Sequence, residues 1–211
     1  MYIPKRYREE DRRKIVEFMQ EYGFVTLVAS DADKPVACHL IVEVVEEGDA
    51  QLINGHMSRA NPLWNLFRPG AEVLVIFQGP HAYISPTWYN HVNVPTWNYQ
   101  SVHAYGEPRV VTGEAEYRDM LSRMIARYEG ASSYRLDGLP GDFVAESMAG
   151  TVGFQVQGKR LEASFKLSQN RDDEDYRNII LELEARPDDL SHGVAAAMRS
   201  HRSLDESPPA D

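Results

Sequence analysis

Apolar residues recur at two spacings along this chain, and the changes between them predict helices and strands. Residues 9–22 combine a helical spacing of apolar positions with a following Gly23, which predicts an amphipathic helix. Runs rich in β-branched and aromatic residues, bounded by turn residues, then predict strands. These predicted strands span about residues 24–30, 36–45, 51–54, 72–78, 81–85 and 98–108. Gly79 and Pro80 are interpreted as a break between two of them.

The pattern becomes helical again beyond Thr112. The predicted helices span about residues 114–129, 142–148 and 172–184. Two returning strands, 151–157 and 161–165, are predicted on either side of a turn at Gly158. Many short strands, with helices at the ends and in one insertion, indicate an α+β, mainly β chain. We expect it to close into a β-barrel with peripheral helices.

The 34 residues from Val73 to Gly106 contain no Asp, Glu, Lys or Arg, although 26% of the whole chain is charged. Aromatic residues, asparagines and histidines fill this charge-free run, and its prolines exclude one continuous helix. A segment that is uncharged, aromatic and able to hydrogen-bond is typical of a pocket wall or a subunit interface.

Composition narrows the classes of function. The chain has no run of about 18 apolar residues and no apolar stretch near its start, so neither a membrane span nor a signal peptide is predicted. A cytoplasmic protein is expected. The single cysteine, Cys38, excludes an intrachain disulfide and a cysteine-based zinc site. The net charge of −10 does not favour direct DNA binding, because duplex-binding proteins normally present a basic face.

The segment NGHMSRANPLW, from Asn54 to Trp64, is the first candidate site. It follows a predicted strand and precedes a short helix that opens near Pro62. Arg59 offers a bidentate donor, Ser58 a hydroxyl and the helix start free N–H groups, a combination suited to a phosphate. A surface turn with an ordinary helix cap is the alternative interpretation.

The aromatic residues of the charge-free run form the second candidate. Tryptophan and tyrosine rings stack on a planar flavin or haem, but core packing explains them almost as well. His81, His91 and His103 are widely spaced, with no acidic residue between them. Hydrogen-bonded neutral histidines are therefore favoured over metal ligands.

The third candidate is KLSQNR, which begins at Lys166 just after a predicted strand. Its lysine would neutralise a phosphate or lie beside the electron-rich edge of a flavin ring. Gln169 would hydrogen-bond to the ring. The alternative is a helix entry capped near Asn170 or Asp172.

Four segments occur in a fixed order, namely HMSRANPLW, FQGPHAYISPTWY, VPTWNYQSVHAYG and KLSQNR. Together they resemble the PaiB family of negative transcriptional regulators. The resemblance assigns residues 1–186 to one domain, and leaves 187–211 as a C-terminal helix and a disordered tail. It implies an FMN-binding split β-barrel that forms a homodimer, with the flavin sites at the subunit boundary.

The resemblance also implies roles for particular residues. Ser58 and Arg59 match the segment that grips the FMN phosphate in this fold. Cys38 and Ile41 depart from an Ala-Thr-His-Leu-Pro pattern, on the pocket floor. The cofactor site that we predict, with FMN as cofactor and no metal ion, consists of His56, Ser58, Arg59, Asn61, Trp97, Lys166 and Gln169.

The function that the resemblance implies is a flavin-linked regulatory factor, connected with repression of protease and sporulation genes. The alternative is an enzyme on the same barrel, either a flavin-dependent oxidoreductase or a haem-binding or haem-degrading protein. Haem would require a histidine as axial ligand, and His56, His81 and His103 are the candidates. The sequence leaves open whether the protein is an enzyme.

Overall fold

The computed structural model of this protein describes residues 1–48 and 50–204, and its contacts divide the chain into two compact units. The barrel unit comprises residues 12–77 and 103–161. The terminal unit comprises residues 1–11, 78–102 and the chain from Glu162 onward. The predicted disordered tail falls mainly on residues 205–211, which lie outside the described residues.

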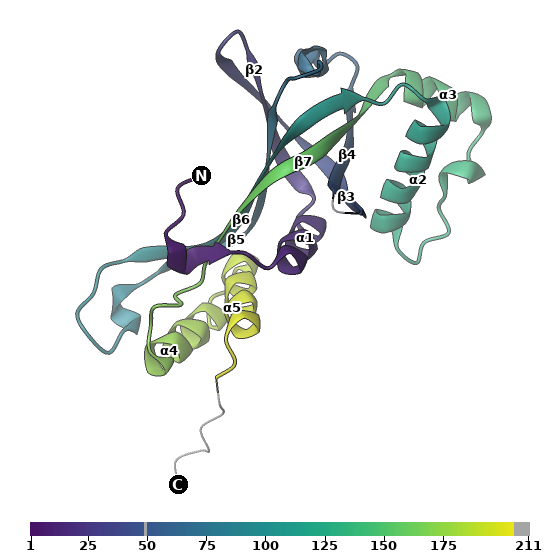
Figure 1. Ribbon diagram of the computed structural model, residues 1–211. Coiled ribbons are helices and arrows are strands. Elements are labelled where there is room, and N and C mark those ends of the chain that lie inside the picture. The colour runs from purple at the N-terminus through teal and green to yellow at the C-terminus, as the bar shows by residue number, and fades with distance from the viewer. Residues whose placement is uncertain (49, 205–211) are drawn as a thin grey trace. The chain divides into compact units, whose positions relative to one another are not determined.

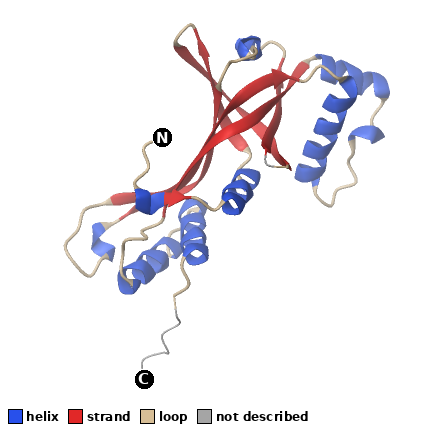
Figure 2. Ribbon diagram, in the orientation of Figure 1, coloured by secondary structure: helices blue, strands red, loops and turns tan. Residues whose placement is uncertain are grey.

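The strands of the described chain form one sheet of seven (Figures 1 and 2). They are β1 (Arg8–Glu9), β2 (Phe24–Asp31), β3 (Lys34–Glu47), β4 (Ala50–Ser58), β5 (Val73–Ile84), β6 (Thr96–Val110) and β7 (Thr151–Lys166). Their order is β1-β7-β4-β3-β2-β5-β6, and β6 also pairs with β7. Six strands therefore close on themselves, which confirms the predicted barrel.

The hairpin between β2 and β3 sets the register of the barrel wall. Ala32 and Asp33 form its turn with positive φ angles of 45° and 69°, as a two-residue hairpin with a right-handed twist requires. The turn pairs Asp31 with Lys34 and places Val25 and Leu27 on the buried face. Alternate residues of each strand therefore line the core.

The barrel core is filled by large apolar side chains from several strands. Leu27, Ile53, Phe77 and Phe154 are completely or almost completely buried there. Gly55 lies against the Phe154 ring, where a Cβ would come within 2.6 Å of a ring carbon, so only glycine fits without a shift.

Helices of the barrel unit pack outside the strands. They are α1 (Arg12–Glu21), the 3₁₀ helix η2 (Pro62–Leu66), α2 (Glu114–Glu129), the 3₁₀ helix η4 (Leu136–Gly138) and α3 (Gly141–Ala149). Figure 1 shows α2 and α3 together beside the strands β4 and β7. An apolar cluster of Val111, Tyr117, Met120 and Met124 fixes α2 there.

The terminal unit contains a helix pair, α4 (Asp173–Glu184) and α5 (Asp189–His201), with the 3₁₀ helices η1 (Lys5–Tyr7) and η3 (Pro86–Trp88). Tyr176 is fully buried between the helices and donates a 2.8 Å hydrogen bond to the carbonyl of Met198. Burial raises the pKa of Tyr176 to about 12. Asp172 caps α4 by accepting from the N–H of Asp175 at 2.9 Å, as one interpretation of the KLSQNR segment predicted.

Two predicted strand breaks are wrong. β5 continues through Gly79 and Pro80, and β7 continues through Gly158. A proline removes one donor but leaves the extended backbone possible. Gly158 pairs in register with Gln51, so it occupies a ladder position and not a turn. No helix of the described chain is long and apolar enough to cross a membrane.

Candidate functional site

Arg59, directly after β4, is held by three hydrogen bonds to the connection between α3 and β7. Its backbone N–H donates to the carbonyl of Gly150 at 3.0 Å. Its guanidinium donates from Nε to the carbonyl of Ala149 at 2.7 Å, and from Nη2 to the carbonyl of Thr151 at 2.8 Å. These bonds use two of the five guanidinium N–H groups and fix the plane of the side chain.

The residues around Arg59 form the capped turn that the sequence also allowed. Asn61 caps η2 by accepting from the N–H of Leu63 at 3.0 Å, and Ser58 accepts from the N–H of Ala60 at 3.3 Å. The indole of Trp64 donates to the carbonyl of Arg59 at 3.1 Å. The turn is therefore rigid, and it presents the guanidinium in one orientation.

A cavity of about 470 Å³ opens beside this guanidinium. We call it the Arg59 cavity; it is lined by Arg59, Trp64, Val110, Val111, Thr112, Gly113, Glu114, Tyr117, Ala145, Met148, Ala149, Thr151, Val152 and Gly153. Gly113 is the N-cap of α2 and offers no side-chain cap, so the first N–H groups of this sixteen-residue helix lie at the wall. A guanidinium, threonine hydroxyls and a helix N-terminus suit an anionic group.

Tyr117 and Glu114 also line the Arg59 cavity. Tyr117 shares a 2.6 Å hydrogen bond with Oγ1 of Thr151, which donates in turn to the carbonyl of Met148 at 3.1 Å. Burial raises the pKa of Tyr117, so its hydroxyl stays protonated at neutral pH. Glu114 is the one acidic member of the lining and opposes an anion.

His56 belongs to a second cavity of the barrel unit, of about 240 Å³. We call it the His56 cavity; it is lined by His56, Leu121, Tyr134, Leu136, Leu139, Phe143, Val144, Ser147, Met148 and Thr151. Nδ1 of His56 is buried and has no hydrogen-bond partner among the described residues. Burial also lowers the pKa of His56, which keeps the ring neutral.

The other three predicted site residues lie in the terminal unit. The Trp97 ring is about half exposed and contacts His81 and Tyr83, with ring centroids 6.1 and 6.2 Å apart. Lys166 bonds through Nζ to the hydroxyl of Thr96, the residue before Trp97. Burial, and secondly the charge of Arg171, lower the pKa of Lys166.

Gln169 is bonded to its own segment. Its amide nitrogen donates to the carbonyl of Phe165, and its amide oxygen accepts from the N–H of Leu167 at 2.8 Å. Of the seven predicted residues, the structure thus brings Ser58, Arg59 and Asn61 into one turn. Trp97 and Lys166 lie near each other through Thr96, His56 lines another cavity, and Gln169 closes a local turn.

The histidines of the charge-free run do not gather around a common point. The ring of His91 lies 3.2 Å from a carboxylate oxygen of Asp175 and 2.9 Å from the amide oxygen of Asn90. Nδ1 of His81 lies 3.4 Å from the carbonyl of Gly79. Among the residues with a described placement there is no group of three or more histidine, cysteine or acidic residues that would hold a metal ion.

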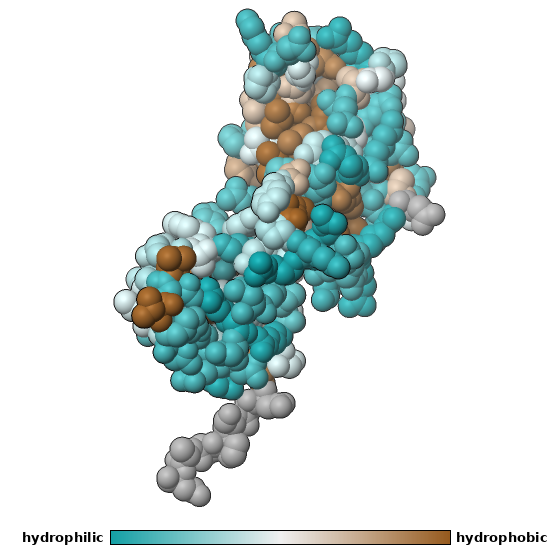
Figure 3. Space-filling view, turned by 60° about the vertical axis from the view of Figure 1, so that its left-hand side comes forward, coloured by the Kyte–Doolittle hydropathy of each residue, from teal (hydrophilic) through white to brown (hydrophobic). Residues whose placement is uncertain are grey.

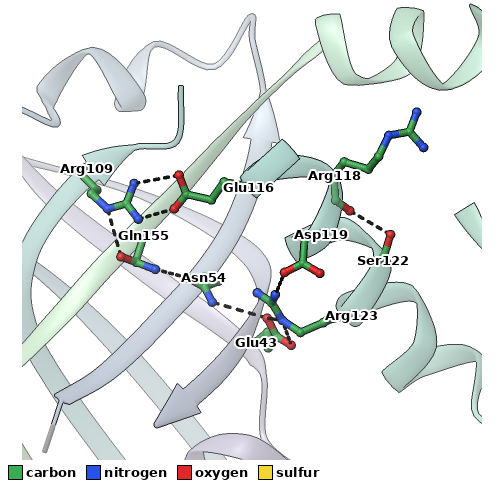
Figure 4. Close-up of polar contacts among 9 residues, drawn as sticks. All are labelled: Glu43, Asn54, Arg109, Glu116, Arg118, Asp119, Ser122, Arg123 and Gln155. Carbon is green, nitrogen blue, oxygen red and sulfur yellow. Dashed lines mark hydrogen bonds and ion pairs between the residues drawn. The ribbon is translucent and has the colours of Figure 1, made fainter. Parts of the chain in front are cut away.

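Sequence reasoning missed a polar network under α2 (Figure 4). Arg123 of α2 donates from Nε to both oxygens of the buried Glu43, at 3.0 and 3.1 Å. Asn54 lies 3.5 Å from Glu43 and accepts from Gln155 at 2.9 Å, and Arg109 donates to Gln155 at 3.0 Å. The sequence does place one polar residue on each of three neighbouring strands. These residues lie directly opposite one another in the sheet, as Glu43, Asn54 and Gln155.

Comparisons with known proteins agree with this architecture. The family described as "Putative FMN-binding domain" matches residues 1–160. "Protease synthase and sporulation protein PAI 2" of Bacillus subtilis (strain 168) is 40% identical over 186 residues, which cover 87% of this chain and 89% of the relative. An uncharacterized protein of Saccharomyces cerevisiae is 33% identical over 154 residues, covering 61% of this chain and 90% of the relative.

Comparison with solved structures identifies proteins of similar fold. The FAD and heme binding protein from Mycobacterium smegmatis superposes with a TM-score of 0.58 at 16% identity, covering 81% of this chain and 79% of that one. The flavocytochrome Anf3 from Azotobacter vinelandii gives a TM-score of 0.57 at 15% identity, covering 81% and 75%. With the closed sheet, these likenesses confirm the predicted split β-barrel with peripheral helices.

Proposed function

This chain belongs to the PaiB family of FMN-binding-domain proteins, and from that premise we propose that it binds FMN and acts as a flavin-linked regulatory factor. The family match spans residues 1–160, so it includes the turn at Arg59 and the whole wall of the Arg59 cavity. The relative from Bacillus subtilis is named for protease synthesis and sporulation, which supports a regulatory role for this chain too.

The position of Arg59 is the observation that carries the proposal. Three hydrogen bonds hold this residue at the wall of a cavity of about 470 Å³. An arginine fixed in this way loses little side-chain freedom when it binds a phosphate. The N-terminus of α2 and the hydroxyl of Thr112 supply further donors from the same wall. The donor set therefore fits the phosphate end of FMN.

We assign the ring end to aromatic and amide groups. Trp97, about half exposed beside His81 and Tyr83, and Lys166, bonded to Thr96, belong to the terminal unit, so we propose their contact with the flavin ring from the family resemblance alone. Ser58 and Asn61 share the turn of Arg59 and belong to the proposed phosphate end, whereas His56 lines a separate cavity and Gln169 is bonded within its own segment. Bound FMN would supply a ring able to take up one or two electrons.

We further propose that the regulatory action does not read DNA grooves directly. The net charge is −10, and the first turn of α4 exposes Asp173 and Glu174. Phosphate backbones repel such a surface. We propose instead that the regulatory signal is a change in the redox state of the flavin, or the binding of a protein partner. Tight sequence-specific DNA binding at physiological salt would contradict this part of the proposal.

A homodimer is part of the same proposal. Figure 3 shows hydrophobic surface on both units, and the large exposed apolar residues include Val92, Val94 and Trp97 in the terminal unit and Phe24 and Ile41 in the barrel unit. A second copy would cover such surface. Sedimentation equilibrium tests this directly, and a mass of 24.0 kDa at micromolar concentration would contradict it.

Titration with FMN and with riboflavin, followed by flavin fluorescence, tests the cofactor proposal. Riboflavin lacks the phosphate, so the wild-type protein is expected to bind FMN more tightly. Arg59→Gln is expected to weaken FMN binding roughly tenfold or more, because charge-assisted hydrogen bonds are lost, and to leave riboflavin binding unchanged.

Two controls make this titration specific. Arg13→Gln removes an exposed arginine of the same unit and is expected to change neither affinity. If Arg59→Gln weakened both ligands equally, Arg59 would be a structural brace only. If adding the protein did not quench the fluorescence of FMN, the FMN proposal would be wrong. A haemin titration covers the alternative, and a histidine-dependent Soret band would make haem the cofactor.

A further inference from the structure

The connection between β7 and α4, in the terminal unit, is a strained turn that buried side chains hold in place. Ser168 has a φ angle of 61°, in the left-handed region that residues with a side chain seldom adopt. Its buried hydroxyl accepts a 2.9 Å hydrogen bond from the amide of the buried Asn98 and donates one of 3.1 Å to it. The backbone N–H of Arg171 closes the turn on the carbonyl of Ser168 at 3.0 Å. Backbone strain fixed in this way is often found at ligand sites.

The turn brings together two partly buried cations, Lys166 and Arg171. Nζ of Lys166 bonds to the hydroxyl of Thr96 and lies 5.8 Å from the centre of the Tyr7 ring. The guanidinium of Arg171 lies over the ring of Tyr89, with Cζ 4.4 Å from its centre. Burial, and secondly the charge of Arg171, lower the pKa of Lys166. The two positive charges therefore lie close enough to repel each other.

Neither of these two cations has a carboxylate partner among the residues that the structure describes. Other arginines of the same unit do have one, since Arg199 pairs with Glu184 and Arg202 with Asp173. The buried carboxylate of Asp175 is bonded to the loop before β6 instead. Two like charges, partly buried and without a counter-ion, are unfavourable, and a bound anion would remove the repulsion between them.

The charges of this pair select a dianion. A phosphate group matches both cations, whereas a carboxylate leaves one of them uncompensated. Arginine binds phosphate through its planar fork and lysine binds it as a point charge. We propose that Lys166 and Arg171, with the hydroxyl of Thr96, bind the phosphate group of a small phosphorylated molecule or free phosphate. This inference does not rest on the FMN proposal, because it concerns a second phosphate site, in the terminal unit.

Titration of the full chain with inorganic phosphate tests the proposal. Two-dimensional NMR follows the backbone amides of residues 168–171 at about pH 8, where phosphate is mainly a dianion, and at constant ionic strength. Wild-type protein is expected to show saturable shifts with phosphate and with sulfate. Acetate, a monoanion, is expected to bind at least about fivefold more weakly. No saturable shift at these amides, or equal affinity for acetate, would overturn the proposal.

Variants of the two cations assign the shifts to them. Lys166→Gln and Arg171→Gln are each expected to weaken phosphate binding roughly tenfold, because a charge-assisted hydrogen bond is lost. Arg171→Lys keeps the charge and is expected to lose less than Arg171→Gln does, which separates charge from misfolding. Arg8→Gln removes an exposed arginine of the same unit and is expected to change nothing. Unchanged phosphate affinity in Arg171→Gln would contradict the proposal.

Further titrations separate this site from the proposed FMN site. Arg59→Gln is expected to leave the phosphate shifts at residues 168–171 unchanged. If FMN affinity fell in Arg171→Gln but not in Arg59→Gln, this site would hold the phosphate of FMN, and only the Arg59 proposal would be wrong. If Lys166→Gln weakened riboflavin binding and left inorganic phosphate unchanged, Lys166 would contact the flavin ring and the present proposal would be wrong.

Discussion

The Arg59 cavity and the His56 cavity share Met148 and Thr151, yet they are built for different chemistry. The Arg59 cavity has two sources of hydrogen-bond donors: a guanidinium that backbone carbonyls hold in place, and the uncapped N-terminus of α2. These donors suit an anionic ligand. The His56 cavity is apolar except for a neutral histidine and the hydroxyl groups of Tyr134, Ser147 and Thr151.

This difference arises from one short segment of β4 and the turn after it. His56 and Ser58 lie two residues apart on the same face of a strand, and Arg59 follows where the strand has ended. The contacts at 149–151 then fix Arg59 towards one cavity, while α2 and α3 enclose His56 in the other. A few residues therefore separate a charged site from an uncharged one.

The largest expected effect comes from crowding the Tyr117 ring at the wall of the Arg59 cavity. A Cβ at Gly153 would come within 2.5 Å of the Tyr117 ring, which is itself buried. Gly153→Ala is therefore expected to lower the free energy of unfolding by about 2 kcal/mol, measured in urea. Gly141→Ala is the matched control, because its Cβ would meet nothing within 4 Å. Equal stability of both variants would show that Tyr117 moves without cost.

Tyr117→Phe sharpens the same comparison. It removes the 2.6 Å hydrogen bond to Thr151, a residue common to both cavities. We expect a loss of about 1 kcal/mol in the free energy of unfolding. The fingerprint NMR spectrum should change at residues of both linings. Changes confined to the Arg59 cavity would mean that the two cavities are independent.

Much of the framework behind these sites was predictable from sequence. The helix at α2 was predicted over 114–129, its observed span, because apolar spacing and Gly130 mark it clearly. The breaks expected at Gly79-Pro80 and Gly158 were wrong, because pairing with neighbouring strands overrides local turn preference.

The sites were less predictable than the framework. The motif pointed to Arg59, but its bonds to residues 149–151 join segments about 90 residues apart, which no local pattern reveals. The sequence also could not assign His56 and Arg59 to different cavities, because only Met57 and Ser58 lie between them. The row of Glu43, Asn54 and Gln155 became visible only with the strand register. The assignment of all seven predicted residues to one cofactor remains a prediction.

The two cavities should also differ in their response to pH. Burial lowers the pKa of His56 below its usual 6.5, so the unfolded chain takes up the proton first as pH falls. The contribution of neutral His56 to stability is complete above pH 6.5 and is lost as pH falls through the lower folded pKa. Wild-type protein should therefore lose more stability between pH 7.5 and 5.5 than His56→Leu does. An identical loss in urea titrations would contradict a buried neutral ring.

The smallest expected effect concerns Glu114, the acidic member of the Arg59 cavity. Its carboxylate repels a phosphate, so Glu114→Gln is expected to tighten FMN binding by a factor of about three and to leave riboflavin unchanged. Isothermal titration at low and high salt checks this, because screening should reduce the difference. A weaker FMN affinity would show that Glu114 helps to hold the cofactor.

A crystal structure of the FMN complex tests the central claim most directly. The account predicts the phosphate within hydrogen-bond distance of the Arg59 guanidinium, in the cavity beside the first turn of α2. A phosphate bound elsewhere, with Arg59 still bonded only to the carbonyls of Ala149 and Thr151, would contradict it.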